Sequence, residues 1–197
     1  MTAPTELYAA RLDVDYPVTL DRVTTAFRII WIIPIAIVLS VLSASAGGIV
    51  LALFGATLLM ILFRQRYPRW WFDFALQFNR FYTRVAAYGT LLTDRYPSTV
   101  EEQSVHLDID YPDAEHDLNR WLPLVKWLLV IPHLIVLYFL FIGALFAVVI
   151  GWFAILFTGR YPRGLFDYVV GVLRWGLRVA AYATLLVTDR YPPFSLR

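Results

Sequence analysis

The stretch Ile29-Ile-Trp-Ile-Ile-Pro-Ile-Ala-Ile-Val-Leu-Ser-Val-Leu-Ser-Ala-Ser-Ala-Gly-Gly-Ile-Val-Leu-Ala-Leu-Phe-Gly-Ala-Thr-Leu-Leu-Met-Ile-Leu-Phe63 runs for 35 residues without a charge. As one helix it would be about 52 Å long, whereas the hydrocarbon core of a bilayer is only about 30 Å thick. We therefore predict two membrane-spanning helices folded back on each other. The small residues of Ser43–Gly48 are the expected turn, because glycine permits the backbone angles that a tight turn requires.

A second uncharged stretch, Trp127–Phe157, contains 31 residues. We predict the same hairpin there, with its turn near Ile142–Ala144. Its first helix should begin near Leu122, so that Lys126 reaches the membrane interface along its aliphatic stem. The sequence thus predicts a mainly α polytopic membrane protein with two transmembrane helices in each half.

Both stretches belong to a duplicated unit with a period of about 94–98 residues, far longer than the repeat of a solenoid. We assign residues 1–100 to a first repeat and residues 101–197 to a second. Because each half has an even number of predicted spans, the halves should be related by a pseudo-twofold axis along the membrane normal. The matching blocks follow in the same order: Leu12–Pro17 and Leu107–Pro112, Arg66–Arg69 and Arg160–Arg163, Phe72–Phe74 and Phe166–Tyr168, Arg84–Tyr88 and Arg178–Tyr182, Asp94–Pro97 and Asp189–Pro192.

Each repeat opens with alternating apolar and acidic residues, at Leu12–Tyr16 and Leu107–Tyr111. This alternation predicts two short strands that pair with each other across the pseudo-twofold. The Asp-x-Asp pairs within them also match a metal-binding motif of many glycosyltransferases, but no nucleotide-binding βα unit surrounds them.

The third predicted helix of each repeat, Trp70–Leu92 and Leu165–Val187, is amphipathic. Its polar residues fall on a stripe about 60° wide at 100° per residue. A lipid-facing span would bury three charges at roughly 2.5–3.5 kcal/mol each, so we expect both helices to lie in the membrane interface. A third spanning helix with its charges inside a bundle is the alternative. The stripe residues are Asp73, Gln77, Arg80 and Arg84 in the first repeat and Asp167, Gly171, Arg174 and Arg178 in the second.

Two interpretations of the stripe remain open. In the first, Asp73 and Asp167 neutralise arginines of their own or the equivalent helix. In the second, Arg80, Arg84, Arg174 and Arg178 bind lipid phosphates or an anionic partner, because a guanidinium binds phosphate through two parallel hydrogen bonds.

His133 follows Pro132 inside a predicted span, where an ionisable group is a functional candidate. Its counterpart in the first repeat is Ile35. Pro34 and Pro132 should each kink a helix and free a carbonyl. We consider two hypotheses for His133. It is neutral and hydrogen-bonded to such a carbonyl, or it belongs to a proton relay.

The composition excludes several classes of protein. The chain is 59% hydrophobic and 16% charged, with a net charge of +2 and no cysteine. It offers no basic run for nucleic acid, no thiolate site and too few histidines for a metal centre. We find no catalytic residues, and predict no metal or cofactor.

Charge also predicts the orientation. Arg28, Arg64, Lys126 and Arg160 flank the predicted spans on the side of the termini, whereas the hairpin turns carry no base. By the positive-inside rule, both termini of this predicted multi-pass protein should be cytoplasmic.

Several blocks resemble a known family. Ile131–Val136, Trp152–Asp167 and Leu186–Phe194 are similar to the signature of an uncharacterised bacterial membrane family, domain of unknown function 4389. The first repeat resembles a diverged copy of the same signature. The resemblance implies an integral membrane protein, so we expect a multi-pass protein of a bacterial inner membrane. It supplies no activity, cofactor or catalytic residue.

Our first functional hypothesis is a non-enzymatic scaffold or accessory subunit that presents a cytoplasmic platform to membrane lipids, a second copy of itself or a membrane-protein partner. A small oligomeric channel or transporter is the alternative, because duplication and prolines within spans recur in transporters. An enzyme acting on lipid is a third, and it would need Asp73 or Asp167 in a polar pocket.

Overall fold

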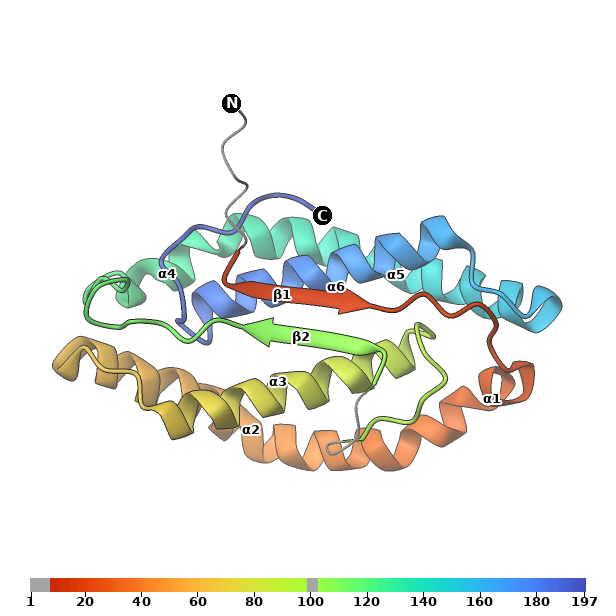
Figure 1. Ribbon diagram of the computed structural model, residues 1–197, viewed down its shortest axis with the longest axis horizontal. Coiled ribbons are helices and arrows are strands. Elements are labelled where there is room, and N and C mark those ends of the chain that lie inside the picture. Colours follow the sequence, from red (N-terminus) through yellow and green to blue (C-terminus); the bar gives the residue numbers. More distant parts are fainter. Residues whose placement is uncertain (1–7, 99–102) are drawn as a thin grey trace.

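Figure 1 shows a computed structural model of the chain, which describes residues 8–98 and 103–197; the side chains of residues 41–53 lie outside this description. Most of the described residues are helical. In chain order the elements are β1 (Ala10–Val14), α1 (Arg22–Ala26), α2 (Arg28–Arg64), α3 (Arg69–Gly89), β2 (Val105–Ile109), α4 (Pro123–Leu129), α5 (Ile131–Thr158) and α6 (Arg163–Ala183).

The two strands form an antiparallel pair that joins the two halves of the chain, as predicted. Leu12 lies opposite Leu107, and these residues hold the same place in the duplicated Leu-Asp-x-Asp-Tyr-Pro motif. A twofold relation between the repeats requires such a pair of equivalent residues at its centre. Each strand begins and ends two residues earlier than predicted, because Tyr16 and Tyr111 leave the ladder to contact the other repeat.

The strands are exchanged between the repeats. β1 of the first repeat packs on α6 of the second, and β2 of the second repeat packs on α3 of the first. Figure 1 shows the strand pair between α6 and α3, with α5 on the far side of α6 and α2 on the far side of α3. Each half therefore completes the fold of the other.

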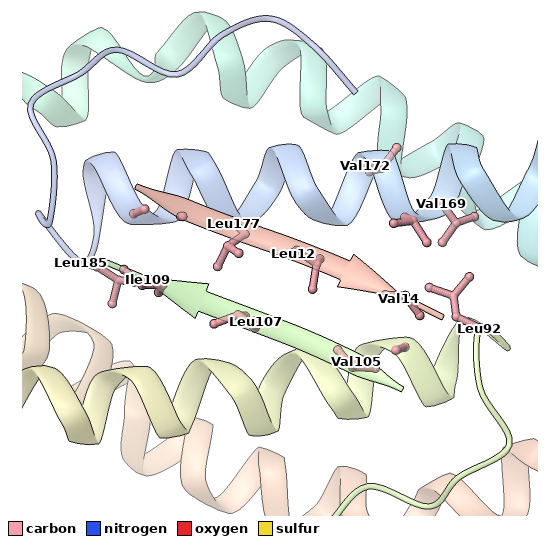
Figure 2. Close-up of a cluster of buried hydrophobic side chains, with 14 of the residues drawn as sticks. Leu12, Val14, Leu92, Val105, Leu107, Ile109, Val169, Val172, Leu177 and Leu185 are labelled. Carbon is pink, nitrogen blue, oxygen red and sulfur yellow. The ribbon is translucent and has the colours of Figure 1, made fainter. Parts of the chain in front are cut away.

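The core lies behind the strand pair. Alternate strand residues point into it, among them Leu12 and Leu107, each only 3% exposed. Figure 2 shows them gathered with Val169, Val172 and Leu177 of α6. A strand turns successive side chains to opposite faces. The charged residues next to these leucines, such as Asp13 and Asp108, therefore face outward.

The predicted hairpin in the first apolar stretch is wrong. α2 is one helix from Arg28 to Arg64, and Ser43–Gly48 lie inside it. A glycine inside a helix costs only about 1 kcal/mol relative to alanine, and an uninterrupted helix pairs its backbone groups internally. The 30 Å limit on which the prediction depended applies only to a helix that crosses a bilayer.

The predicted turn in the second stretch is also wrong, because α5 continues through Ile142–Ala144. Its glycines permit close packing instead of a turn. A Cβ added at Gly143 would lie 2.5 Å from the hydroxyl of Tyr168, and one at Gly151 would lie 2.6 Å from the ring of Tyr161. Within the described residues, α5 is the one helix of sufficient length and apolar composition to cross a membrane.

Pro132 does not kink a span. It occupies the first turn of α5, where its missing N–H costs nothing, and it separates α5 from the short helix α4. Pro34 does lie inside α2. Lys126 of α4 does not reach an interface as predicted, since its side chain is fully buried.

α3 and α6 end three to four residues before the predicted ends at Leu92 and Val187. Leu91, two residues after α3, and Leu186, three residues after α6, adopt left-handed backbone conformations, with φ of 65° and 56°. A residue in this conformation cannot continue a right-handed helix. The chain then turns back towards the strand pair.

Candidate functional site

The arginine stripe of α3 and α6 faces the exchanged strands. The Nε of Arg80 donates to the carbonyl of Leu107 at 2.9 Å, and its guanidinium pairs with Asp108 at 2.9 Å. Equivalently, the Nε of Arg174 donates to the carbonyl of Leu12 at 2.8 Å, and its guanidinium pairs with the next residue of β1 at 3.4 Å. Both arginines therefore attach one repeat to the strand of the other.

The second arginine of each stripe binds the chain that follows its helix. Arg84 donates to the carbonyl of Ser98 and Arg178 to that of Ser195, each at 2.5 Å. In both, the buried Nε has no partner among the described residues. Burial, followed by the charge of Arg174, lowers the pKa of Arg178 from its ordinary value.

Asp73 and Asp167 pair with arginines of their own helices, as the first interpretation of the stripe predicted. The partners are Arg69, at 3.6 Å, and Arg163, at 3.2 Å, one turn towards the N-terminus of each helix. Both pairs are more than half exposed. Such surface pairs contribute about 0–1 kcal/mol, so they help little in holding the fold.

His133 has a different partner from the one predicted. It is fully buried, and its Nδ1 accepts a hydrogen bond from the indole N–H of Trp175 at 3.1 Å. Its ring stacks on Phe194, with 3.9 Å between ring centres. The predicted bond to a carbonyl freed by a proline is wrong, because Pro132 starts the helix and frees no carbonyl.

A pair of buried cations was not predicted. Arg28 is 3% exposed and pairs with Asp94, and Lys126 is fully buried with its Nζ 2.6 Å from Asp189. Each cation also lies over a tyrosine ring, at 4.2 Å and 4.8 Å from the ring centre. Burial lowers the pKa of Lys126, and the neighbouring carboxylate opposes that shift. The sequence does carry the signal: a base precedes each apolar stretch and an Asp-Arg-Tyr-Pro block ends each repeat.

Two Tyr-Pro dipeptides, one after each strand, connect the repeats by hydrogen bonds. Tyr16, after β1, donates its hydroxyl hydrogen bond to the carbonyl of Tyr161 at 2.5 Å, and Tyr111, after β2, donates to that of Tyr67. An arginine of the contacted repeat lies over each donor ring, at 4.5 Å and 4.6 Å. Each strand is thus attached at its end to the repeat that it packs on.

Alkaline pH tests the burial of these tyrosines. Burial raises the pKa of Tyr67 and of Tyr161 to about 12, from an ordinary value of 10.0. The folded state thus retains both protons more strongly than the unfolded chain, so their contribution to stability is complete below pH 10 and is lost as the pH rises towards 12. The unfolding free energy should fall less steeply with pH over this range in Tyr67→Phe, because the variant releases about one proton fewer on unfolding. Urea titrations at stepwise pH, followed by circular dichroism, measure this slope; an unchanged slope contradicts the assignment.

A cavity of about 810 Å³ lies between β1, α6 and the last residues of the chain. It brings together Arg174 and Arg178 of the predicted site, but not Arg80, Arg84, Asp73, Asp167 or His133. Its lining was otherwise missed by the sequence analysis, because the positions lie far apart in the chain. The other charged or aromatic residues that line it are Tyr8, Arg11, Asp13, His106, Asp108, Arg190, Tyr191 and Arg197.

No group of three or more His, Asp or Glu side chains is placed to bind a metal ion within residues 8–98 and 103–197. The charged lining of the cavity is instead rich in guanidinium groups, which are hydrogen-bond donors with no acceptor. Such a lining is suited to an anion.

Comparison with known families agrees with the duplicated architecture. The model of the domain of unknown function DUF4389 matches residues 22–101 and, a second time, residues 121–195. The chain therefore belongs to this family, and the predicted tandem resemblance is confirmed. No curated protein and no solved structure matches the chain.

Proposed function

We propose that the protein is a non-enzymatic membrane-surface platform. It lies along the cytoplasmic face of a bacterial inner membrane, with α2 and α5 in the lipid and the strand pair in water, so that both termini are cytoplasmic. The observation that carries this proposal is the separation of exposed side chains: large apolar ones on the long helices, charged ones on the strands.

The long helices expose apolar side chains that no other part of the described chain covers. Only 22% of the most apolar 18-residue stretch of α5 is buried, whereas the core helix of a soluble protein would be mostly buried. Leu145 and Phe146 in the middle of α5 are each 64% exposed, and Ile29 and Phe63 near the ends of α2 are 74% and 73% exposed. Contiguous exposed apolar surface of this kind is typical of contact with a membrane or a partner.

The exposed carboxylates of the strand pair support this orientation of the molecule. The side chains of Asp13, Asp108 and Asp110 are 77%, 65% and 54% exposed. The strands lie beside the middle of α3 and α6, so upright long helices would place these carboxylates near the bilayer centre. Each would then cost roughly 2.5–3.5 kcal/mol on insertion scales. With the long helices parallel to the membrane, the same carboxylates lie in water.

Two further features support this orientation. Trp31, Trp70, Trp121 and Trp127 are each more than half exposed, and tryptophan favours the boundary between lipid and water. The local twofold axis of an antiparallel strand pair is perpendicular to the sheet, so a sheet facing water places this axis along the membrane normal. The predicted symmetry is thereby kept without transmembrane hairpins.

Site-directed labelling tests the orientation. Because the chain has no cysteine, each introduced cysteine is the single reactive thiol. Arg22→Cys and Arg66→Cys lie near opposite ends of α2, and we expect both to react with an impermeant maleimide from the same side of sealed vesicles. Asp13→Cys should react from that side as well, whereas the lipid should protect Leu145→Cys from the maleimide.

The ends of α2 distinguish the alternatives in the same experiment. Labelling of positions 22 and 66 from opposite sides of the vesicle would overturn the platform and show that α2 crosses the bilayer. Full labelling at position 145 in the presence of lipid would show that α5 does not contact the membrane. Detergent-solubilised vesicles, in which the cysteines at all four positions should react, are the control for the reactivity of each thiol.

A small oligomeric channel is the second candidate, and the middle position of Arg80 and Arg174 along their helices favours it. Upright subunits could shield the exposed carboxylates by turning the strand pairs towards a shared pore. This arrangement requires α2 to cross the bilayer and vesicles containing the protein to conduct ions. A flux assay on the vesicles used for labelling measures the second requirement.

A further inference from the structure

The cavity beside β1 carries a marked excess of positive charge. Its charged lining consists of five arginines and two aspartates, which leaves three positive charges in excess while His106 is neutral. The arginines come from three separate parts of the chain: Arg11 from β1, Arg174 and Arg178 from α6, and Arg190 and Arg197 from the C-terminal segment. Like charges repel, so an anion between these arginines would relieve the repulsion.

Arg178 supplies a buried donor at the cavity wall. The residue is only 6% exposed, and its Nε has no hydrogen-bond partner among the described residues. A buried donor without an acceptor loses the hydrogen bond that water would supply, and this destabilises the folded state most when the donor is charged. An acceptor oxygen in the cavity would satisfy it.

The equivalent region of the first repeat differs in charge. Gln103 and His106 there occupy the places of Tyr8 and Arg11, and Arg95 occupies the place of Arg190. These three residues line a separate cavity of about 490 Å³ together with Asp15 and Asp94. One arginine against two carboxylates leaves that cavity without an excess of positive charge. Arg80 and Arg84, the equivalents of Arg174 and Arg178, do not line it.

We infer that the cavity lined by Arg11, Arg174, Arg178, Arg190 and Arg197 is a binding site for a phosphate-bearing anion. Guanidinium groups keep their charge when partly desolvated and bind phosphate oxygens through paired hydrogen bonds. The volume lies within the range of about 300–1,000 Å³ that is usual for small-ligand pockets. Inorganic phosphate, a small phosphate ester and a lipid headgroup share this chemistry. The inference does not depend on how the protein lies on a membrane.

The first arm of the test uses the full chain in a neutral detergent. Isothermal titration with inorganic pyrophosphate, at low and constant ionic strength, measures the affinity. The double variant R11Q/R197Q removes two charges from exposed or half-exposed positions at the cavity, and we expect its affinity to fall at least about tenfold. R95Q/R160Q also removes two positive charges, but outside this cavity, and it should keep the affinity of the unchanged chain.

Arg178→Lys tests geometry separately from charge. It keeps the positive charge and removes the planar donor group, so pyrophosphate affinity should fall while the dependence of binding on salt stays nearly the same. A thermal unfolding curve for each variant, without ligand, shows whether the fold is kept. If Arg178→Lys unfolds, R11Q/R197Q still decides the result.

The second arm distinguishes the two sources of phosphate. The same chains are incorporated into nanodiscs containing phosphatidylcholine alone or with phosphatidic acid, and pyrophosphate is titrated again. Competition by phosphatidic acid assigns the site to a lipid headgroup, and undiminished binding assigns it to a free anion. Two results overturn the site: equal loss of affinity in R11Q/R197Q and R95Q/R160Q, or no binding of either probe by the unchanged chain.

Discussion

Asp189→Asn is expected to lower the free energy of unfolding by about 3–5 kcal/mol, because it leaves a buried ammonium without a counter-charge. Lys126 has no solvent exposure, its Nζ lies 2.6 Å from the Asp189 carboxylate, and it also donates to the carbonyl of Thr188 at 2.7 Å. Asparagine keeps the shape of the aspartate and removes its charge. Urea unfolding in a neutral detergent, followed by far-ultraviolet circular dichroism, measures the change.

The double variant K126M/D189N is the matched control for this prediction. Methionine fills the space of the lysine stem, and removal of both charges of a buried pair is often neutral or even stabilising. The double variant should therefore be more stable than D189N. Asp110→Asn, which breaks an exposed pair with Arg11, should cost no more than about 1 kcal/mol. Similar losses in D189N and D110N would show that Lys126 is hydrated.

Leu107→Ala is expected to cost about 2–5 kcal/mol, the range for removing a buried leucine side chain from a packed core. Leu107 is 3% exposed and lies opposite its equivalent, Leu12, at the centre of the strand pair (Figure 2). Because the strands are exchanged, both repeats lose a contact. Urea unfolding should therefore remain one transition with a lower midpoint when it is followed by tryptophan fluorescence.

His106→Ala, one residue earlier in the same strand, is the control, because the side chain of His106 is 56% exposed. It should change the free energy of unfolding by less than about 1 kcal/mol. Two separate transitions in Leu107→Ala would contradict the coupling of the repeats. A loss equal to that of His106→Ala would contradict the burial of this position.

The sequence predicted the parts of the fold that depend on repetition and alternation. The two strands and the third helix of each half follow from patterns within short windows, and the pairing of the strands follows from the duplication of the blocks. The hairpins were not predictable in this way. Gly47 and Gly48 permit a turn as readily as a helix, and the choice depends on whether the helix packs along α3 or crosses a bilayer.

The candidate site was predictable only in part, for a similar reason. The periodicity of α3 and α6 located the arginine stripe, but no local pattern shows that Arg80 and Arg174 bind strands from the other repeat. The cavity depends on Tyr8 and Arg197, which are 189 positions apart. Contacts at such separations follow from the exchange of strands, which the order of blocks along the chain does not reveal.

The exchange of strands between the halves also bears on the origin of the chain. A polypeptide with one repeat alone would carry a strand without its helix and a helix without its strand, and two such polypeptides would complete each other as a domain-swapped homodimer. Joining the copies in one chain turns this concentration-dependent association into an intramolecular one. It also frees each copy to diverge, as the unlike residues at positions 11 and 106 illustrate.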